Sequence, residues 1–165
     1  MEQALAAVAY HFPWSSLMTQ FKFQEHTGWA RSFATLMRSA PWVEPALENA
    51  DWLLPMPLSR TRLQERGFNQ AMLLARALEP DKVRADILLR VKETQPQSSL
   101  PRKDRLLAVR GAYALEPKHM PLVNDKKIVL VDDVMTTGAS LHAAASILRR
   151  AGAAHITTLV FARTE

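Results

Sequence analysis

The 165-residue sequence predicts an α/β fold, a mostly parallel sheet flanked by helices. Three features predict it: an apolar run at Ile128–Val131, an amphipathic segment at Leu141–Arg150, and a final apolar run at His155–Phe161. Continuous runs of Ile, Val and Leu are typical of strands buried on both faces, as in parallel sheets covered by helices. The strand–helix–strand order implies a right-handed parallel crossover.

Length and composition bound the kind of protein. The length predicts one domain over residues 1–165, and 48% hydrophobic with 22% charged residues is ordinary for a globular protein. No apolar run approaches the ~20 residues of a membrane span. The absence of cysteine excludes disulfides and a cysteine-ligated zinc site in this chain, and it agrees with a cytoplasmic location. The net charge of +5 suits polyanionic ligands, such as a pyrophosphate or a nucleic acid, but also a surface selected for solubility.

The first fifty residues contain apolar patterns without polar site residues. Residues 4–10 fit a short strand, and apolar residues from Trp14 to Phe23 and from Trp29 to Met37 predict two helices, the second ended by Pro41. The aromatic side chains of these helices are expected in the core rather than stacked on a cofactor. Trp52–Leu54 is the next predicted strand.

A stiff loop and a basic stretch follow this strand. Prolines in Pro55–Leu58 fix the backbone and remove amide donors. Next come three arginines in seven residues, Arg60, Arg62 and Arg66, before a predicted helix over 69–78. Guanidinium groups match phosphate oxygens with two parallel hydrogen bonds. Because the stretch follows the end of a strand, we interpret it as an anion site; an exposed basic loop is the alternative.

The middle of the chain is harder to interpret. Residues 85–91 and 112–115 fit strands, residues 92–101 form a polar, proline-containing loop, and residues 102–110 are basic and helical in pattern. This basic segment contains three cations near its start: Arg102, Lys103 and Arg105. It fits a lid over a ligand, a nucleic-acid contact or a solvated face, and the sequence does not separate these.

The stretch from Ile128 to Ser140 carries the strongest functional signal. Its apolar run ends in Asp132 and Asp133, whose ionised carboxylates accept hydrogen bonds from sugar hydroxyls. Backbone amides of the following turn, its hydroxyl side chains and the start of the next helix favour a phosphate. Gly138 permits a positive φ or a close backbone approach. The alternative is a solvated acidic turn with Ser140 as an N-cap. The G-x-x-x-x-G-K-[ST] and G-x-G-x-x-G motifs are absent.

This stretch resembles the signature with which type I phosphoribosyltransferases bind phosphoribosyl pyrophosphate (PRPP). Four further motifs resemble one branch, the ComF/GntX family of phosphoribosyltransferase-like proteins associated with competence and DNA uptake. They are P-M-P-L-S at 55–59, R-x-x-x-R-G-F-N-Q at 62–70, a T-x-x-Q/S region at 94–99 and R-G-A-Y at 110–113. The resemblance extends over nearly the whole chain and implies a type I phosphoribosyltransferase-like fold.

The resemblance also implies roles for individual residues. Asp132 and Asp133 match the catalytic pair that holds the ribose hydroxyls. The 5′-phosphate loop would comprise Met135, Thr136, Thr137, Gly138, Ala139 and Ser140. The pyrophosphate site would comprise Met56, Pro57, Leu58 and Ser59, with Arg60, Arg62 and Arg66 as neighbouring anion contacts. Mg²⁺ would be held mainly through PRPP oxygens, with the two aspartates assisting rather than forming a protein-only metal site.

Two functions therefore remain open. The first is an enzyme that transfers the phosphoribosyl group to an acceptor with loss of pyrophosphate; no sequence feature identifies the acceptor. The second is a non-catalytic competence protein that binds single-stranded DNA or a DNA-uptake helicase through its basic segments. Many members of the family carry an N-terminal cysteine-rich zinc-binding segment, which this sequence lacks.

Overall fold

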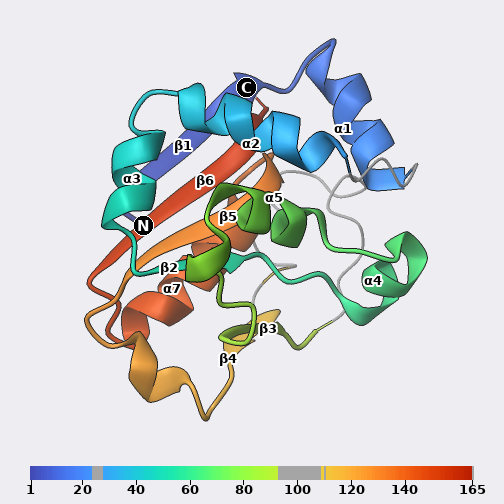
Figure 1. The fold of residues 1–165 in the computed structure, drawn as a ribbon. Helices are drawn as coiled ribbons and strands as arrows, with labels where there is room; N and C mark the ends of the chain where they lie inside the picture. The colour runs from blue at the N-terminus through green and yellow to red at the C-terminus, as the bar shows by residue number, and fades with distance from the viewer. Residues whose placement is uncertain (24–27, 93–108, 110, 165) are drawn as a thin grey trace.

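The computed structural model describes residues 1–23, 28–92, 109 and 111–164. Its main sheet has four parallel strands in the order β1-β6-β5-β2 (Figure 1). The strands are β1 (Gln3–Ala9), β2 (Trp52–Pro55), β5 (Lys127–Met135) and β6 (His155–Arg163). The predicted fold class, a mostly parallel sheet flanked by helices, is confirmed.

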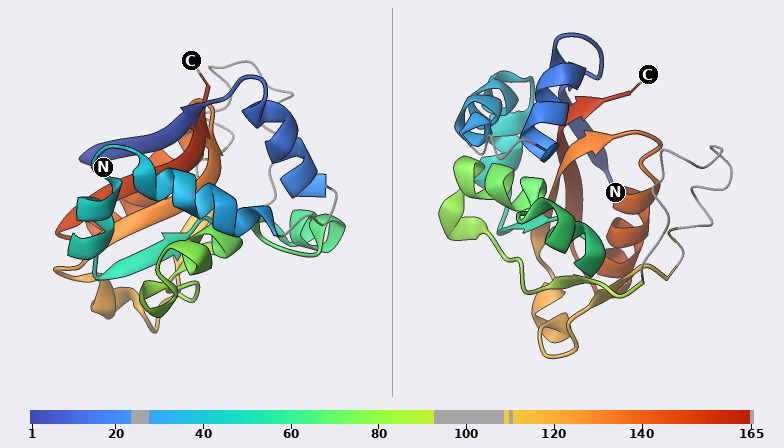
Figure 2. Two further views of the ribbon diagram at one scale, coloured as in Figure 1. Left: turned by 45° about the horizontal axis from the view of Figure 1, so that its top comes forward. Right: turned by 90° about the vertical axis from the view of Figure 1, so that its right-hand side faces the viewer.

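Helices cover both faces of this sheet. Helices α2 (Trp29–Ser39), α3 (Val43–Asn49) and α5 (Gln70–Leu78) lie on one face, and α7 (Ala139–Arg150) lies on the other (Figure 2). The side chains of β5 alternate between the two layers, because successive residues of a strand point to opposite faces. Val129 and Val131 pack in the core under α2 and α5, whereas Ile128 and Leu130 pack in the core under α7.

Aromatic side chains pack α1 (Trp14–Phe23) against the sheet and α2. The ring of Phe21 meets Phe33 of α2 edge-on with centroids 5.3 Å apart, and Phe33 lies 4.1 Å from Phe161 of β6. Trp14 also packs edge-on against Phe161. Phe21, Phe33 and Phe161 are buried, so these aromatics belong to the core as expected.

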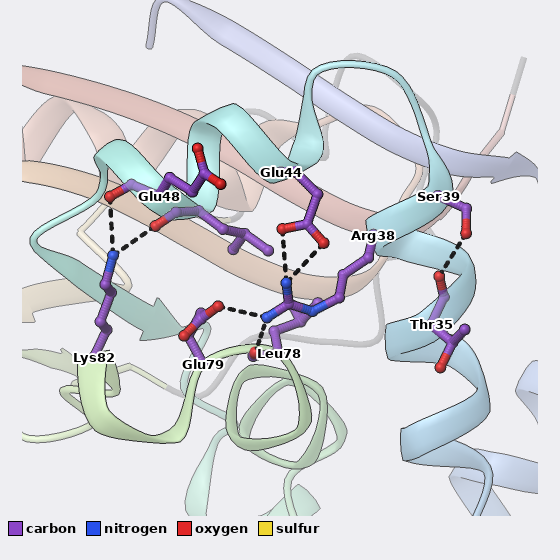
Figure 3. Close-up of polar contacts among 9 residues, drawn as sticks. Thr35, Arg38, Ser39, Glu44, Glu48, Leu78, Glu79 and Lys82 are labelled. Atoms are coloured by element: carbon purple, nitrogen blue, oxygen red, sulfur yellow. Dashed lines mark hydrogen bonds and ion pairs between the residues drawn. The ribbon is translucent and has the colours of Figure 1, made fainter.

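An ion-pair network joins the helices of the α2–α3–α5 layer (Figure 3). Arg38 of α2 donates to Glu44 of α3 at 2.7 Å, and it also contacts Glu79 and the carbonyl of Leu78 at the end of α5. Lys82 donates to the carbonyl of Leu47 at 2.8 Å and to that of Glu48, at the end of α3. The network lies within the helical layer and holds α5, whose first residues enter the site described below.

Several elements differ from the sequence-based expectations. The basic stretch after β2 is a helix, α4 (Arg60–Arg66), whose first turn is capped by Ser59 and which ends at Gly67 with φ 76°. Helix α3 was not predicted. The predicted strands in the middle of the chain are shorter and form a separate antiparallel pair, β3 (Leu88–Arg90) with β4 (Tyr113–Leu115).

Short 3₁₀ turns occupy two of the connections, η1 (Pro80–Lys82) and η3 (Met120–Val123). The predicted basic arm, including Arg102, Lys103 and Arg105, lies outside the described residues. Within the described part of the chain, no helix is both long and apolar enough to span a bilayer.

Candidate functional site

A cavity of about 760 Å³ opens at the carboxyl ends of the parallel strands. It is lined by segments from β5, α7, α4, α5, α1 and the loop after β2. Most predicted site residues line it: Met56, Pro57, Leu58, Arg62, Arg66, Asp132, Asp133, Met135, Thr136, Gly138, Ala139 and Ser140. The cavity therefore brings together residues of the acidic-pair stretch, of the P-M-P-L-S motif and of the R-x-x-x-R-G-F-N-Q motif; the T-x-x-Q/S region at 94–99 lies outside the described residues.

The acidic pair lies inside the second half of β5 rather than beyond it. Strand β5 continues to Met135 because β6 is long enough to pair as far as Arg163, opposite Met135. The carboxylate of Asp132 accepts a hydrogen bond from the backbone N–H of Asp133 at 2.9 Å. Burial, followed by the charge of the Asp133 carboxylate, raises the pKa of Asp132 to about 8. The protein alone thus disfavours two negative charges at this point.

Lys22 is a site residue that the sequence analysis missed. Its ammonium lies 3.0 Å from the Asp133 carboxylate, and it comes from the last turn of α1. Asp133 also accepts a hydrogen bond from the backbone N–H of Val134 at 2.6 Å. Lys22 carried no sequence signal because it stands in an apolar helix more than a hundred residues before the acidic pair.

The predicted phosphate loop, residues 135–140, has the geometry that its glycine indicates. Gly138 adopts φ 72° and precedes the first turn of α7, which begins at Ala139. Ser140 therefore lies within the helix and is not its N-cap, contrary to the alternative considered from sequence. Thr136 lines the cavity, whereas Thr137 accepts a hydrogen bond from the N–H of Ala139 at 3.4 Å and is not part of the lining.

Positive charge gathers on the α4 side of the cavity. Arg62 and Arg66 of α4 line it together with Arg90 of β3, a residue that was not predicted. Burial, followed by the charges of Arg90 and Arg66, lowers the pKa of Arg62. An anion bound here would reduce this repulsion. Of the other predicted contacts, Arg60 is exposed outside the cavity lining, and buried Ser59 caps α4.

Tyr113 connects the cationic side to the phosphate loop. Its hydroxyl accepts a hydrogen bond from Arg90 at 3.2 Å and forms another with Ser140. Burial raises the pKa of the Tyr113 phenol, so the hydroxyl stays protonated at neutral pH. Tyr113 is the tyrosine of the R-G-A-Y motif, and this network gives the motif a structural role.

The R-G-F-N-Q motif also positions parts of the site. Arg66 donates to the side-chain oxygen of Gln70 at 3.0 Å, and the amide of Gln70 donates to the backbone carbonyl of Lys22 at 3.5 Å. Asn69 donates to the carbonyl of Met56 at 3.0 Å and caps α5 by accepting from Met72. One short motif thus links α4, α5, α1 and the loop after β2.

Comparison with known proteins agrees with this arrangement. Residues 63–165 match the family described as phosphoribosyl transferase domain. Competence protein F of Haemophilus influenzae is 34% identical over 166 residues, which cover 93% of this chain and 69% of that protein. The chain belongs to the ComF family of phosphoribosyltransferase-like proteins. Competence protein ComFC of Bacillus subtilis is 37% identical, and the match covers 68% of this chain and 44% of that protein. DNA utilization protein YhgH of Escherichia coli K12 is 31% identical, and the match covers 98% of this chain and 73% of that protein.

The donor set of this ComF-family site is compatible with a shared rather than a protein-only magnesium site. Among the described residues, no group of three or more His, Asp or Glu side chains is arranged to hold a metal ion. Of the described residues that line the cavity, Asp132, Asp133 and Glu65 carry carboxylates, and the two aspartates come from the strand that leads into the predicted phosphate loop. Mg²⁺ characteristically takes one or two carboxylates and completes its shell with phosphate oxygens and waters. The two aspartates fit that role in the presence of a phosphorylated ligand.

Proposed function

We propose that this ComF-family protein binds PRPP, or a nucleotide through its 5′-phosphate, together with Mg²⁺, and transfers the phosphoribosyl group to an acceptor. The observation that supports the proposal is that one cavity joins an acidic pair, a phosphate loop at a helix start and a cluster of arginines. PRPP carries the matching groups on one molecule: ribose hydroxyls, a 5′-phosphate and a pyrophosphate.

Each part of the site has a distinct task in the proposed reaction. The turn from Thr136 to Gly138 and the first turn of α7 would bind the 5′-phosphate through backbone N–H groups and the Ser140 hydroxyl. Asp132 and Asp133 would accept hydrogen bonds from the ribose hydroxyls and fix the sugar.

The loop after β2 and the arginines would hold the leaving group. The bond between C1 of the ribose and the pyrophosphate oxygen breaks, and the acceptor's nucleophilic atom forms the new bond to C1. Arg62 and Arg66 would stabilise the charge that develops on the departing pyrophosphate, and bound Mg²⁺ would neutralise part of it. No covalent protein nucleophile is needed, because the site works by positioning and by electrostatics.

Mg²⁺–PRPP titration followed by thermal melting tests the proposal. At a hundred times the dissociation constant, binding stabilises the fold by about 2.7 kcal/mol, or roughly 5–10 °C for a domain of this size. The wild type should shift, whereas the Asp132→Asn/Asp133→Asn double variant should stay folded without shifting. A wild type that does not respond to Mg²⁺–PRPP refutes the proposal.

A matched pair on α4 sharpens this test. Arg62→Met removes a cation that lines the cavity, and Arg60→Met removes an exposed cation two residues away. A charge-assisted contact contributes about 1.5–3 kcal/mol, so Arg62→Met should weaken PRPP binding by roughly 10- to 100-fold. Arg60→Met should bind as the wild type does. Equal effects of the two variants would argue for nonspecific attraction. Pyrophosphate release with candidate acceptors then tests transfer itself.

The names of the relatives support a second candidate, a role in DNA uptake without catalysis. Competence protein F and ComFC carry competence in their names, and YhgH is called a DNA utilization protein. In this reading the chain binds single-stranded DNA or a helicase partner. For a site that neutralises Z phosphates, log–log plots of affinity against salt should have a slope of about −0.7Z. Absence of salt-dependent binding to single-stranded DNA would remove the DNA arm of this candidate.

A further inference from the structure

Lys22 lines the cavity and forms an ion pair with Asp133 of the acidic pair. Its ammonium lies 3.0 Å from Oδ2 of Asp133, and the two side chains keep only 19% and 13% of their surfaces exposed. Oδ1 of Asp133 already accepts from the backbone N–H of Val134. Lys22 therefore contacts the oxygen of Asp133 that is not used by the strand.

The backbone of Lys22 also forms a hydrogen bond. The buried amide of Gln70, 1% exposed, donates to the Lys22 carbonyl, and Gln70 is itself bound by Arg66. The aromatic contacts of Phe21 with Phe33 fix the preceding residue of α1. The lysine is thus fixed from both sides, unlike a flexible surface lysine that happens to meet a carboxylate.

We propose that Lys22 is the internal counter-cation of the acidic pair. In the absence of other ligands its ammonium disfavours the binding of free Mg²⁺, and it is displaced when Mg²⁺ binds together with a sugar phosphate. The proposal rests on the sugar-phosphate site described above, but its test does not require that ligand. An ammonium at 3.0 Å satisfies part of the negative charge that would attract a bare cation. A ligand that supplies its own phosphate oxygens completes the coordination shell of Mg²⁺, so that Mg²⁺ can then compete with the Lys22 ammonium for the carboxylates.

The consequence is a defined order of binding. With Lys22 in place, Mg²⁺ alone gains only one or two carboxylate oxygens and must displace an ammonium. With Lys22 removed, the carboxylates are left without this cation in a largely desolvated place, where an uncompensated charge is costly. Mg²⁺ alone should then bind and restore the lost stability. Lys22 would act in this way as a positioning residue for Asp133 and as a filter on the metal.

The experiment is thermal melting of the full chain with MgCl₂ as the only ligand, at constant ionic strength set with NaCl. The variants are Lys22→Met, Lys22→Arg and, as the matched control, Lys82→Met, which loses a lysine that binds the α3 carbonyls instead. At Mg²⁺ ten times above its dissociation constant, Lys22→Met should gain about 3–6 °C. The wild type, Lys22→Arg and Lys82→Met should each change by less than about a third of that.

Every outcome bears on the proposal. A Lys22→Met protein that responds to Mg²⁺ no more than Lys82→Met overturns it, as does a Lys22→Arg protein that responds like Lys22→Met. If Lys22→Met is unfolded in EDTA, refolding by Mg²⁺ but not by NaCl supports the proposal, and failure to refold overturns it. If the wild type does not respond to Mg²⁺–PRPP while Lys22→Met still binds Mg²⁺, the proposed function fails together with the displacement of Lys22 by Mg²⁺–PRPP, whereas the exclusion of free Mg²⁺ by Lys22 stands.

Discussion

Replacing Asp132 with asparagine should stabilise the ligand-free protein at neutral pH and abolish binding of the sugar phosphate. The substitution keeps the side-chain oxygen that accepts from the N–H of Asp133, and it removes a charge that the folded protein disfavours. Because the variant keeps the hydrogen bond and loses the charge, the change in its stability measures the free energy that the charge of Asp132 costs the folded protein.

The magnitude follows from the pKa. Burial and the neighbouring Asp133 raise the pKa of Asp132 from its ordinary value of 3.8 to about 8. The folded state is therefore favoured below the unfolded pKa, where Asp132 is protonated in both states, and it loses stability as the pH rises from about 4 toward 8. The full shift corresponds to about 6 kcal/mol. Because the Asp132 residue is only half-buried by its exposed surface and the charge of Lys22 opposes the shift, we expect about 1–3 kcal/mol to be realised.

Melting curves of the wild type and Asp132→Asn between pH 4 and pH 8 measure this effect. The variant should melt roughly 3–9 °C higher at pH 8, and the difference should shrink toward pH 4. Asp133→Asn is the control: it breaks the ion pair with Lys22 and should lower the melting temperature. An Asp132→Asn protein that melts at or below the wild type at pH 8, or a difference independent of pH, would refute the reasoning.

Three further predictions concern the frame of the site. Gly138→Ala has room, since the new Cβ would lie 3.4 Å from the Met135 sulfur. The positive φ should nevertheless lower the stability by about 1–2 kcal/mol, which thermal melting measures. The variant should also bind the sugar phosphate more weakly. Asn69→Ala removes a helix cap and the contact with the Met56 carbonyl, so chemical denaturation should show a loss of about 1–2 kcal/mol and titration a higher Kd for PRPP. Arg38→Met leaves two carboxylates without their cation and should lower the stability by about 2–3 kcal/mol with PRPP affinity unchanged.

The fold was predictable where a local pattern determined the structure. The apolar runs of β5 and β6 and the amphipathic stripe of α7 identify the parallel core, because strands buried on both faces are near-continuous apolar runs. Strands were expected near β3 and β4, but their antiparallel pairing was not. The two strands have three residues each and are separated by more than twenty residues, so no local pattern indicates the pairing. Helix α4 was missed because it has no buried residue and hence no apolar period; its signals were the Ser59 cap and Gly67.

The site was predictable where its residues are adjacent in sequence. The acidic pair, the turn with Gly138 and the loop after β2 each form a contiguous motif, and the cavity joins them. Lys22 and Arg90 reach the same cavity from α1 and β3 through tertiary packing, and nothing in their immediate neighbours distinguishes them from surface cations. For the R-G-F-N-Q motif, the sequence indicated membership of a branch; the structure adds that both the oxygen and the nitrogen of the Gln70 amide form hydrogen bonds.

On both sides of the cavity the protein disfavours the charged form of an ionisable group, a cation on one side and an anion on the other. Arg62 has its pKa lowered by burial and by neighbouring arginines, whereas Asp132 has its pKa raised by burial and by a neighbouring aspartate. A nucleic-acid backbone would relieve only the first, and its phosphates would be repelled by the second. A free sugar would relieve neither charge, because hydroxyls carry none. A phosphorylated sugar that brings a divalent cation supplies anions to the arginines and a cation to the aspartates. This complementarity favours PRPP over DNA as the ligand of the cavity, and it leaves DNA, if it binds, to another surface of the chain.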